Sequence, residues 1–307
     1  MTKSSFELMS DPAVQIQAGD WRKDYMWGAS FLFMRMGATE FGPLTTAWLR
    51  VFIAALMLLP LMLWQGHFKV FKAHWKMVLG FGLINSALPF ALYAYAVMHI
   101  STGLSAILNA SVPLFAALVA WLWLGDRLNR WRIAGLIIGF VGVSLLANNQ
   151  TSFHNAANPD ASAWGQNTAI AACLLAVICY AISGSLTKKY MTDMPALVSA
   201  TGSQIGASMA LTVPALFTLP DTMPGAKAWF GVVMLGLACT GVAYILYFRL
   251  VNRAGPAKAL TVTFLIPVFA LVYGVIFLGE TVTLIMVLLG MLVILGTALS
   301  SGLFPKK

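Results

Sequence analysis

Long apolar stretches alternate with short polar ones along nearly the whole chain. Runs of this length match helices that cross the roughly 30 Å apolar core of a bilayer. A membrane β-barrel would instead show apolar and polar residues in strict alternation, and the sequence has no such stretch. The pattern therefore predicts an all-α integral membrane protein with ten transmembrane helices, because a helix satisfies its own backbone groups in lipid. The ten runs cover approximately residues 24–40, 44–65, 75–98, 102–124, 131–148, 167–190, 196–219, 228–252, 257–279 and 283–303.

The second half of this pattern repeats the first at an offset of 154 residues. Each half carries five runs, an odd number, so the two copies are predicted to cross the membrane in opposite directions. Such inverted repeats are typical of transporters that bind their substrate between the halves. The residues that recur are Tyr93 as Tyr247, Pro113 as Pro267, Leu124-Gly125 as Leu278-Gly279, and Asp126 as Glu280.

The repeat predicts a simple domain organisation around a central cavity. A polar N-terminal tail covers residues 1–23, and a first five-helix repeat covers 24–148. A polar linker at 149–166 leads to a second, inverted five-helix repeat at 167–307.

Composition and charge agree with a membrane protein of fixed orientation. The chain is 60% hydrophobic and 9% charged, whereas soluble domains carry about 25% charged residues. Of the 19 Lys and Arg residues, 16 fall on the side of the N-terminus if the runs cross in turn. This positive-inside bias predicts a multi-pass membrane protein with both termini in the cytoplasm. The net charge of +9 then reflects contact with anionic lipid rather than with nucleic acid.

Several classes of chemistry are disfavoured by what the sequence lacks. The turns are too short for a catalytic domain, and no Gly-rich phosphate loop follows a strand pattern. The four histidines are scattered, and the three cysteines lie inside apolar runs as expected of packing residues. We therefore expect no enzyme activity, cofactor or metal, and no obligatory protein partner.

Polar and aromatic residues near the middle of several runs share helical faces. Thr240, Tyr244 and Tyr247 lie at i, i+4 and i+7, a spacing that puts them on one face. The matching positions of the first half are Ser86, Phe90 and Tyr93. One interpretation is that such hydroxyls and amides only hold helices together; the other, which we favour for the whole set, is an aromatic-lined substrate cavity. The candidate substrate-binding residues are Trp27, Ser30, Ser86, Phe90, Tyr93, Asn109, Tyr180, Ser183, Thr240, Tyr244, Tyr247 and Thr263.

Prolines lie within several of the runs, among them Pro89, Pro113 and Pro267. Proline removes a helical hydrogen bond and frees a carbonyl, which membranes tolerate where neighbours or a watered cavity satisfy that group. These prolines are candidate hinges beside the cavity, with ordinary structural kinks as the alternative.

No Asp or Glu falls deep within any run. A buried carboxylate is the usual carrier of protons or site for cations in a transporter, so its absence favours a neutral or zwitterionic substrate. Arg35 and Arg50 lie toward the outer ends of the first two runs. We expect them to extend to the surface or pair with Glu40; contact with a substrate carboxylate is the alternative.

Closely spaced glycines predict tight helix packing in the last run of each half. Gly135, Gly139 and Gly142 share one face of the fifth run, and the tenth carries Gly290 and Gly296. Small residues at this spacing let helices approach closely. A scaffold role is favoured over a dimer face.

Two long segments carry a family resemblance. "TGLSAILNASVPLFAALVAWLWLGDRL" (102–128) and "PAKALTVTFLIPVFALVYGVIFLGETV" (256–282) resemble the repeated signature of EamA-type members of the drug/metabolite transporter superfamily. This resemblance implies ten spans, an inverted five-plus-five repeat, a central cavity and alternating access.

A narrower resemblance is carried by the first and third runs. "WGASFLFMRMG" (27–37) and "LPFALYAYAVMHIS" (88–101) are similar to YddG-like amino-acid exporters of bacterial inner membranes. It implies export of aromatic and other neutral amino acids, with Trp27, Ser30, Tyr93 and Asn109 on the cavity wall. A multidrug or other small-metabolite exporter of the same superfamily is the alternative. The second half departs from symmetry where Gln204 replaces Arg50.

Overall fold

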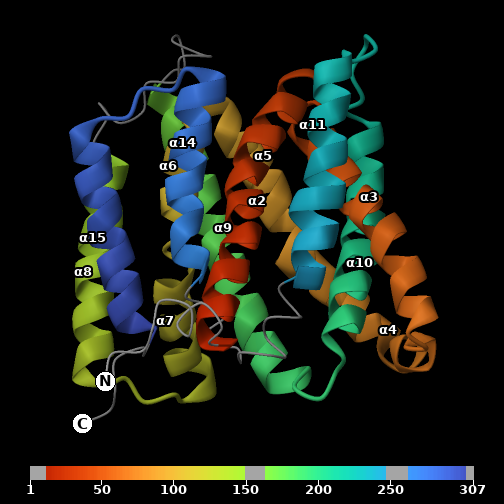
Figure 1. Ribbon diagram of the computed structural model, residues 1–307, viewed down its shortest axis with the longest axis horizontal. Coiled ribbons are helices and arrows are strands. Elements are labelled where there is room, and N and C mark those ends of the chain that lie inside the picture. Colours follow the sequence, from red (N-terminus) through yellow and green to blue (C-terminus); the bar gives the residue numbers. More distant parts are fainter. Residues whose placement is uncertain (1–11, 149–162, 247–261, 302–307) are drawn as a thin grey trace.

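The protein is a bundle of helices, seen here in a computed structural model (Figure 1). It describes the backbone of residues 12–148, 163–246 and 262–301, and the side chains of 25–148, 164–246 and 264–301. Every regular element in these ranges is helical. The α-helices are α2 (Pro12–Phe41), α3 (Pro43–Trp64), α4 (Phe68–Gly82), α5 (Leu88–His99), α6 (Thr102–Asn109), α7 (Val112–Leu124), α8 (Arg130–Asn148), α9 (Ala163–Tyr190), α10 (Ala196–Leu216), α11 (Ala226–Gly236), α14 (Ile266–Leu278) and α15 (Leu284–Ser300).

The predicted apolar runs coincide with helical segments wherever the backbone is described. Within the described residues, six continuous helical stretches are long and apolar enough to cross a membrane, and α14 and α15 are shorter apolar helices. The full count of ten crossings stays a prediction. Helix α2 begins at Pro12, earlier than the run predicted from residue 24, so helical backbone extends into the predicted tail.

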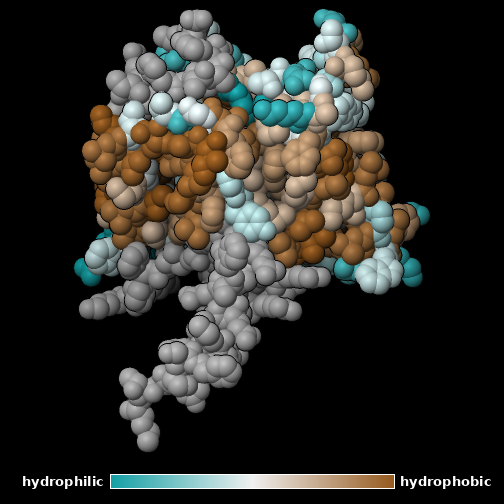
Figure 2. All heavy atoms as spheres, turned by 45° about the horizontal axis from the view of Figure 1, so that its top comes forward, coloured by the Kyte–Doolittle hydropathy of each residue, from teal (hydrophilic) through white to brown (hydrophobic). Residues whose placement is uncertain are grey.

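The outside of the bundle carries a broad apolar belt. Figure 2 shows hydrophobic side chains covering the middle of the visible face, with hydrophilic ones gathered toward its upper and lower edges. Large side chains such as Leu122, Ile276 and Leu284 are more than half exposed. Water would disfavour such a surface, whereas the hydrocarbon of a bilayer suits it. The chain is therefore a multi-pass membrane protein.

The two halves are inverted copies that interlock. The α2–α3 turn and the equivalent α9–α10 turn lie at opposite ends of the bundle (Figure 1). Helix α2 packs against α11 and α14 of the second half, and its counterpart α9 packs against α5 and α7 of the first. Each half thus inserts its first helix between helices of the other.

Local backbone geometry repeats along with the sequence. Gly125 ends α7 with φ 70°, and Gly279 ends α14 with φ 66°, a left-handed conformation that favours glycine. The following amides make equivalent bonds, from Asp126 to the Ala120 carbonyl at 3.2 Å and from Glu280 to Gly274 at 3.0 Å. The repeated Leu-Gly pairs of the sequence are therefore helix C-caps.

A π-helical turn interrupts the third helical segment of each half. Helix α4 continues through a π-turn at Leu83–Ala87 into α5, and α11 continues into a π-turn at Leu237–Val242. The two turns lie at the same repeat position, since residues 83 and 237 differ by 154. Single π-turns occur often at functional sites. Pro89 follows the first turn at the start of α5.

The other two candidate hinge prolines also lie beside breaks in regular helix. Pro113 is the second residue of α7, which follows a gap at 110–111. Pro267 is the second residue of α14, which follows a 3-10 turn at Val262–Leu265. The Thr297 hydroxyl donates to the Ala110 carbonyl at 3.1 Å, which satisfies a group that the break leaves free. Movement about these prolines stays a prediction.

The glycine-rich helices form one edge of the bundle. Helices α8 and α15 pack against each other there (Figure 1). A Cβ on Gly135 would lie 2.7 Å from the Gly296 carbonyl oxygen, and one on Gly142 would lie 3.2 Å from the Val293 nitrogen. The expected scaffold packing of these glycines is confirmed. All three cysteines are buried and free, as expected of packing residues.

Candidate substrate site

Tyr93 and Asn109 meet in the centre of the bundle. The Tyr93 hydroxyl donates to Asn109 Oδ1 at 3.0 Å. The Tyr93 ring meets Phe31 edge-on at 5.7 Å and stacks with Tyr180 at 6.3 Å. These separations suit favourable aromatic pairs. Helices α2, α5, α6 and α9 therefore bring an amide and three aromatic rings together.

Asn85, in the first π-turn, links both halves through its side-chain amide. Its Oδ1 accepts a hydrogen bond from the Ser183 hydroxyl at 2.7 Å. Its Nδ2 lies 3.3 Å from Ser86 Oγ and 3.5 Å from the Tyr244 hydroxyl oxygen. Sequence reasoning missed Asn85, although an amide inside an apolar run, next to a candidate serine, is a signal that could have found it.

Arg50 also lies at this centre, which overturns the expectation that it extends to the surface or pairs with Glu40. It is only 6% exposed. Its Nε donates to Thr240 Oγ1 at 2.9 Å, and its guanidinium carbon lies 3.6 Å from the Phe90 ring centroid. Arginine at the middle of a membrane helix costs about 2.5–3.5 kcal/mol. A charge-assisted hydrogen bond and a desolvated cation–π contact, each about 2 kcal/mol, offset that cost.

Gln204 occupies the repeat position of Arg50 and makes the equivalent contact. Its Nε2 donates to Ser86 Oγ at 3.0 Å and lies 3.3 Å from Ser203 Oγ. Its Oε1 is buried and has no hydrogen-bond partner in the described part of the chain. A buried acceptor without a partner is unfavourable, which marks this oxygen as a point that a ligand could satisfy.

We call these residues the central polar cluster. Its members come from both halves, and all of them are buried or half-buried. They are Arg50, Asn85, Ser86, Tyr93, Asn109, Tyr180, Ser183, Gln204, Thr240 and Tyr244.

The remaining predicted residues have mixed placements. Phe90 underlies the Arg50 guanidinium, and Trp27 packs against the hydrophobic core that contains Tyr93. The Ser30 hydroxyl donates to the Trp27 carbonyl of its own helix at 2.7 Å. Tyr247 and the Thr263 side chain lie outside the described residues.

The acidic residues whose side chains are described lie at helix ends or in turns rather than in the cluster. Glu280 is 6% exposed and accepts hydrogen bonds from the Thr102 amide at 2.7 Å and the Gly103 amide at 3.4 Å. It therefore caps the N-terminus of α6. Arg35 is 3% exposed, so Arg35 too is buried instead of extending outward. The repeat counterpart of Glu280, Asp126, pairs with exposed Lys188 at 2.7 Å.

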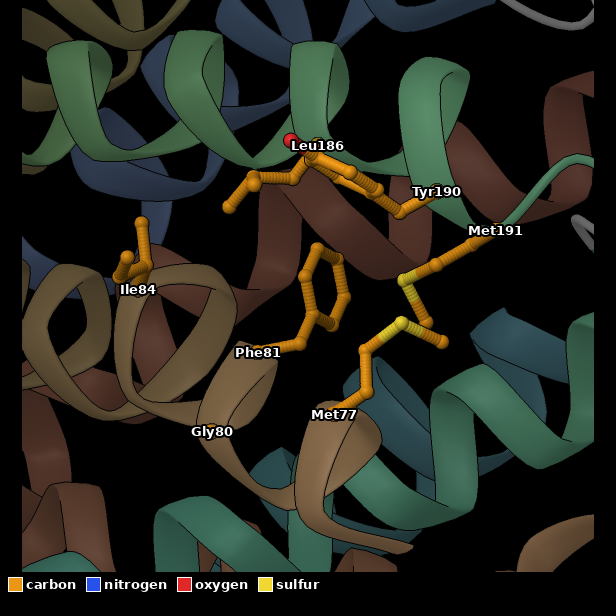
Figure 3. Close-up of a pocket in the computed structure, with 7 residues that line it drawn as sticks. All are labelled: Met77, Gly80, Phe81, Ile84, Leu186, Tyr190 and Met191. Carbon is orange, nitrogen blue, oxygen red and sulfur yellow. The ribbon is translucent and has the colours of Figure 1, made fainter. Parts of the chain in front are cut away.

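A pocket of about 170 Å³ lies between α4 and α9. Figure 3 shows the Phe81 ring projecting toward Leu186 and Tyr190, with the side chains of Met77 and Met191 meeting beside it. Ile84, which also lines it, directly precedes Asn85. A second pocket of about 380 Å³ shares Tyr190 and lies toward the α9–α10 turn. Neither pocket is lined by members of the cluster, so the central cavity stays a prediction.

An inverted bundle with a polar centre and an apolar belt defines a membrane transporter. The model of the EamA-like transporter family matches the chain twice, at residues 25–148 and 167–302. The chain therefore belongs to the EamA-like transporter family.

Similar proteins are transporters by name. YoaV of Bacillus subtilis, named an uncharacterized transporter, is 23% identical over 297 residues, covering 96% of this chain and 99% of its own. YedA of Escherichia coli K12, named an uncharacterized inner membrane transporter, is 25% identical over 297 residues, covering 92% of this chain and 90% of its own. One crystal structure, 18% identical, aligns with TM-score 0.65 over 93% of this chain and 96% of its own, and shares the fold.

Proposed function

We propose that this transporter exports aromatic and other neutral amino acids across a bacterial inner membrane, by alternating access around the central polar cluster. The observation that carries the proposal is the pairing of Tyr93 with Asn109 beside Phe31 and Tyr180. Aromatic rings can stack against an apolar or aromatic side chain, while amides and hydroxyls bind the polar end of an amino acid. The direction of transport rests on the resemblance to YddG-like exporters.

The charge of the cluster argues against the alternative of an exporter of cationic drugs. Its described members include one cation, Arg50, and no carboxylate. Cation carriers usually hold a buried acid at this depth. A neutral small metabolite remains the second candidate, and a transport panel separates it from amino acids.

The distribution of Lys and Arg supports a route from the cytoplasm. By the positive-inside rule, the end that carries the α9–α10 turn faces the cytoplasm. The pocket between α4 and α9 lies toward this end and reaches Ile84, beside Asn85. An amino acid leaving the cytoplasm would pass Met77 and Phe81 before it meets the cluster.

Transport by purified protein tests the proposal. Proteoliposomes preloaded with unlabelled phenylalanine should accumulate labelled phenylalanine by exchange, and should discriminate against drugs and sugars. Tyr93→Ala and Asn109→Ala should each lower the rate at least about tenfold, because each loses cluster contacts. Tyr95→Ala is the matched control, since Tyr95 lies in the same helix and bonds to Thr168 instead. Absence of exchange for every amino acid would refute the proposal.

A further inference from the structure

Arg50 is a buried cation without a described counter-ion. Lys188–Asp126 is the one ion pair within 4.0 Å among the described residues, and Glu280 bonds to the start of α6. Residues 247–261, whose structure is not described, contain no Asp or Glu in sequence. An ionisable residue inside a membrane helix marks a functional site by default.

The contacts of Arg50 hold its guanidinium in place and leave one edge free. Nε is used by Thr240, and the planar face rests on Phe90. In the described part of the chain, Nη1 and Nη2 have no hydrogen-bond partner. These two nitrogens form the edge of the fork that binds a carboxylate through two parallel bonds.

The two repeat-related sides of the cluster differ in charge. Gln204 stands where symmetry would put a second arginine. Its amide nitrogen is bound to Ser86, and its buried Oε1 is an acceptor without a partner. One side of the cluster therefore offers cationic donors, while the other offers a neutral acceptor suited to an ammonium group.

We propose that Arg50 recognises the carboxylate of the substrate and that Gln204 Oε1 accepts from its ammonium group. This rests on the proposed function and narrows it: the transported species is an α-amino carboxylate, and amines or esters that lack the free carboxylate are rejected. The departure from exact symmetry at this one pair of positions sets the orientation of the substrate.

Competition between matched analogues tests the proposal in the wild-type protein. Phenylalanine, phenylalaninamide and phenethylamine share the ring and the ammonium group but differ in the carboxylate. Each would compete with labelled phenylalanine exchange in proteoliposomes. We expect phenylalanine to compete roughly ten- to a hundredfold better than the other two, because a charge-assisted bond is lost with each. Equal competition by all three would overturn the role of Arg50 and leave amino-acid transport intact.

Variants test whether Arg50 causes the preference for a substrate with a free carboxylate. Arg50→Gln places at position 50 the side chain found at 204, and should reduce the preference for phenylalanine over phenylalaninamide at least about tenfold. Arg35→Gln is the matched control, since Arg35 is also buried but outside the cluster. It should change the amount of folded protein rather than this ratio. An unchanged ratio in folded Arg50→Gln would refute the proposal.

Direct binding separates this proposal from the proposed function. Thermal stabilisation of purified protein by 3-phenylpropanoate, which has the carboxylate and no ammonium, should occur in wild type and in Arg50→Lys. It should be absent with phenethylamine. If no amino acid is transported but this carboxylate still stabilises the protein, the function fails and the Arg50 site stands. If the carboxylate gives no stabilisation in wild type, the site fails.

Discussion

Arg50 of the first half donates a hydrogen bond to Thr240 of the second at 2.9 Å, and this contact is repeated with the halves exchanged. Gln204 of the second half donates to Ser86 of the first at 3.0 Å. Both acceptors lie in π-turns. The two donors are 154 residues apart in the sequence, and so are the two acceptors. The repeat thus preserves the geometry of the contact while changing its charge.

Removing the two acceptors should have unequal effects on stability. Thr240→Val removes the hydrogen-bond acceptor of the buried Arg50 cation and should lower the free energy of unfolding by about 1.5–3 kcal/mol. Ser86→Ala removes an acceptor of the neutral Asn85 and Gln204 amides and should lower it by about 0.5–1.5 kcal/mol. Unfolding titrations in mixed micelles measure both free energies. Equal costs would mean that Arg50 is compensated by groups other than Thr240.

The hydroxyl and the ring of Tyr93 should contribute separately. Tyr93→Phe removes the bond to Asn109 but keeps the contacts with Phe31 and Tyr180. A double-mutant cycle of Tyr93→Phe with Asn109→Ala should give a coupling free energy of about 0.5–1.5 kcal/mol. Exchange of phenylalanine should fall less in Tyr93→Phe than in Tyr93→Ala. Coupling near zero would contradict a direct bond.

Gly82 should be intolerant of a side chain because α4 meets α10 there. A Cβ at Gly82 would come into hard contact with the Ser203 carbonyl and lie 2.9 Å from the Ala207 nitrogen. Gly82→Ala should therefore destabilise by about 1–3 kcal/mol. Gly80→Ala is the control in the same helix, since nothing lies within 4 Å of that position. It should be neutral or stabilise by up to about 1 kcal/mol, as the same titrations would measure.

Glu280 and Asp126 occupy the same repeat position but should contribute unequally to the free energy of unfolding. Glu280→Gln weakens a buried cap of α6 and should cost about 2–3 kcal/mol. Asp126→Asn breaks an exposed ion pair with Lys188 and should cost at most about 1 kcal/mol. The cost of Asp126→Asn should also shrink with added salt, because exposed charges are screened. A larger cost for Asp126→Asn than for Glu280→Gln would contradict the difference in burial.

Much of the architecture was predictable because membranes constrain it strongly. Apolar runs located the helices, and the 154-residue offset located equivalent positions such as Gly125 and Gly279, which prove to be matching helix caps. The π-turns were not predictable, because no residue pattern demands them. Each follows a glycine, Gly82 or Gly236, whose lack of a side chain allows a neighbouring helix to approach.

The candidate site was predicted in part. Periodicity placed Tyr93, Ser86 and Thr240 on inward faces, and Tyr93 does meet Asn109. The prediction for Arg50 was wrong because its distance from the end of its run suggested that the long side chain could reach the surface. The residues that contact Arg50, Phe90 and Thr240, belong to other helical segments. The spacing of residues near Arg50 in the sequence does not predict these contacts.

By itself the sequence determined the membrane class, the two-fold repeat and its inversion, because apolar length, offset and the odd number of runs are properties of the chain alone. Only the tertiary structure decided which polar residues meet. Asn85, Arg50 and Gln204 join one cluster because π-turns and close helix crossings direct their side chains inward. Side-chain direction at a helix crossing depends on the neighbouring helix, which the spacing of residues along one helix does not contain.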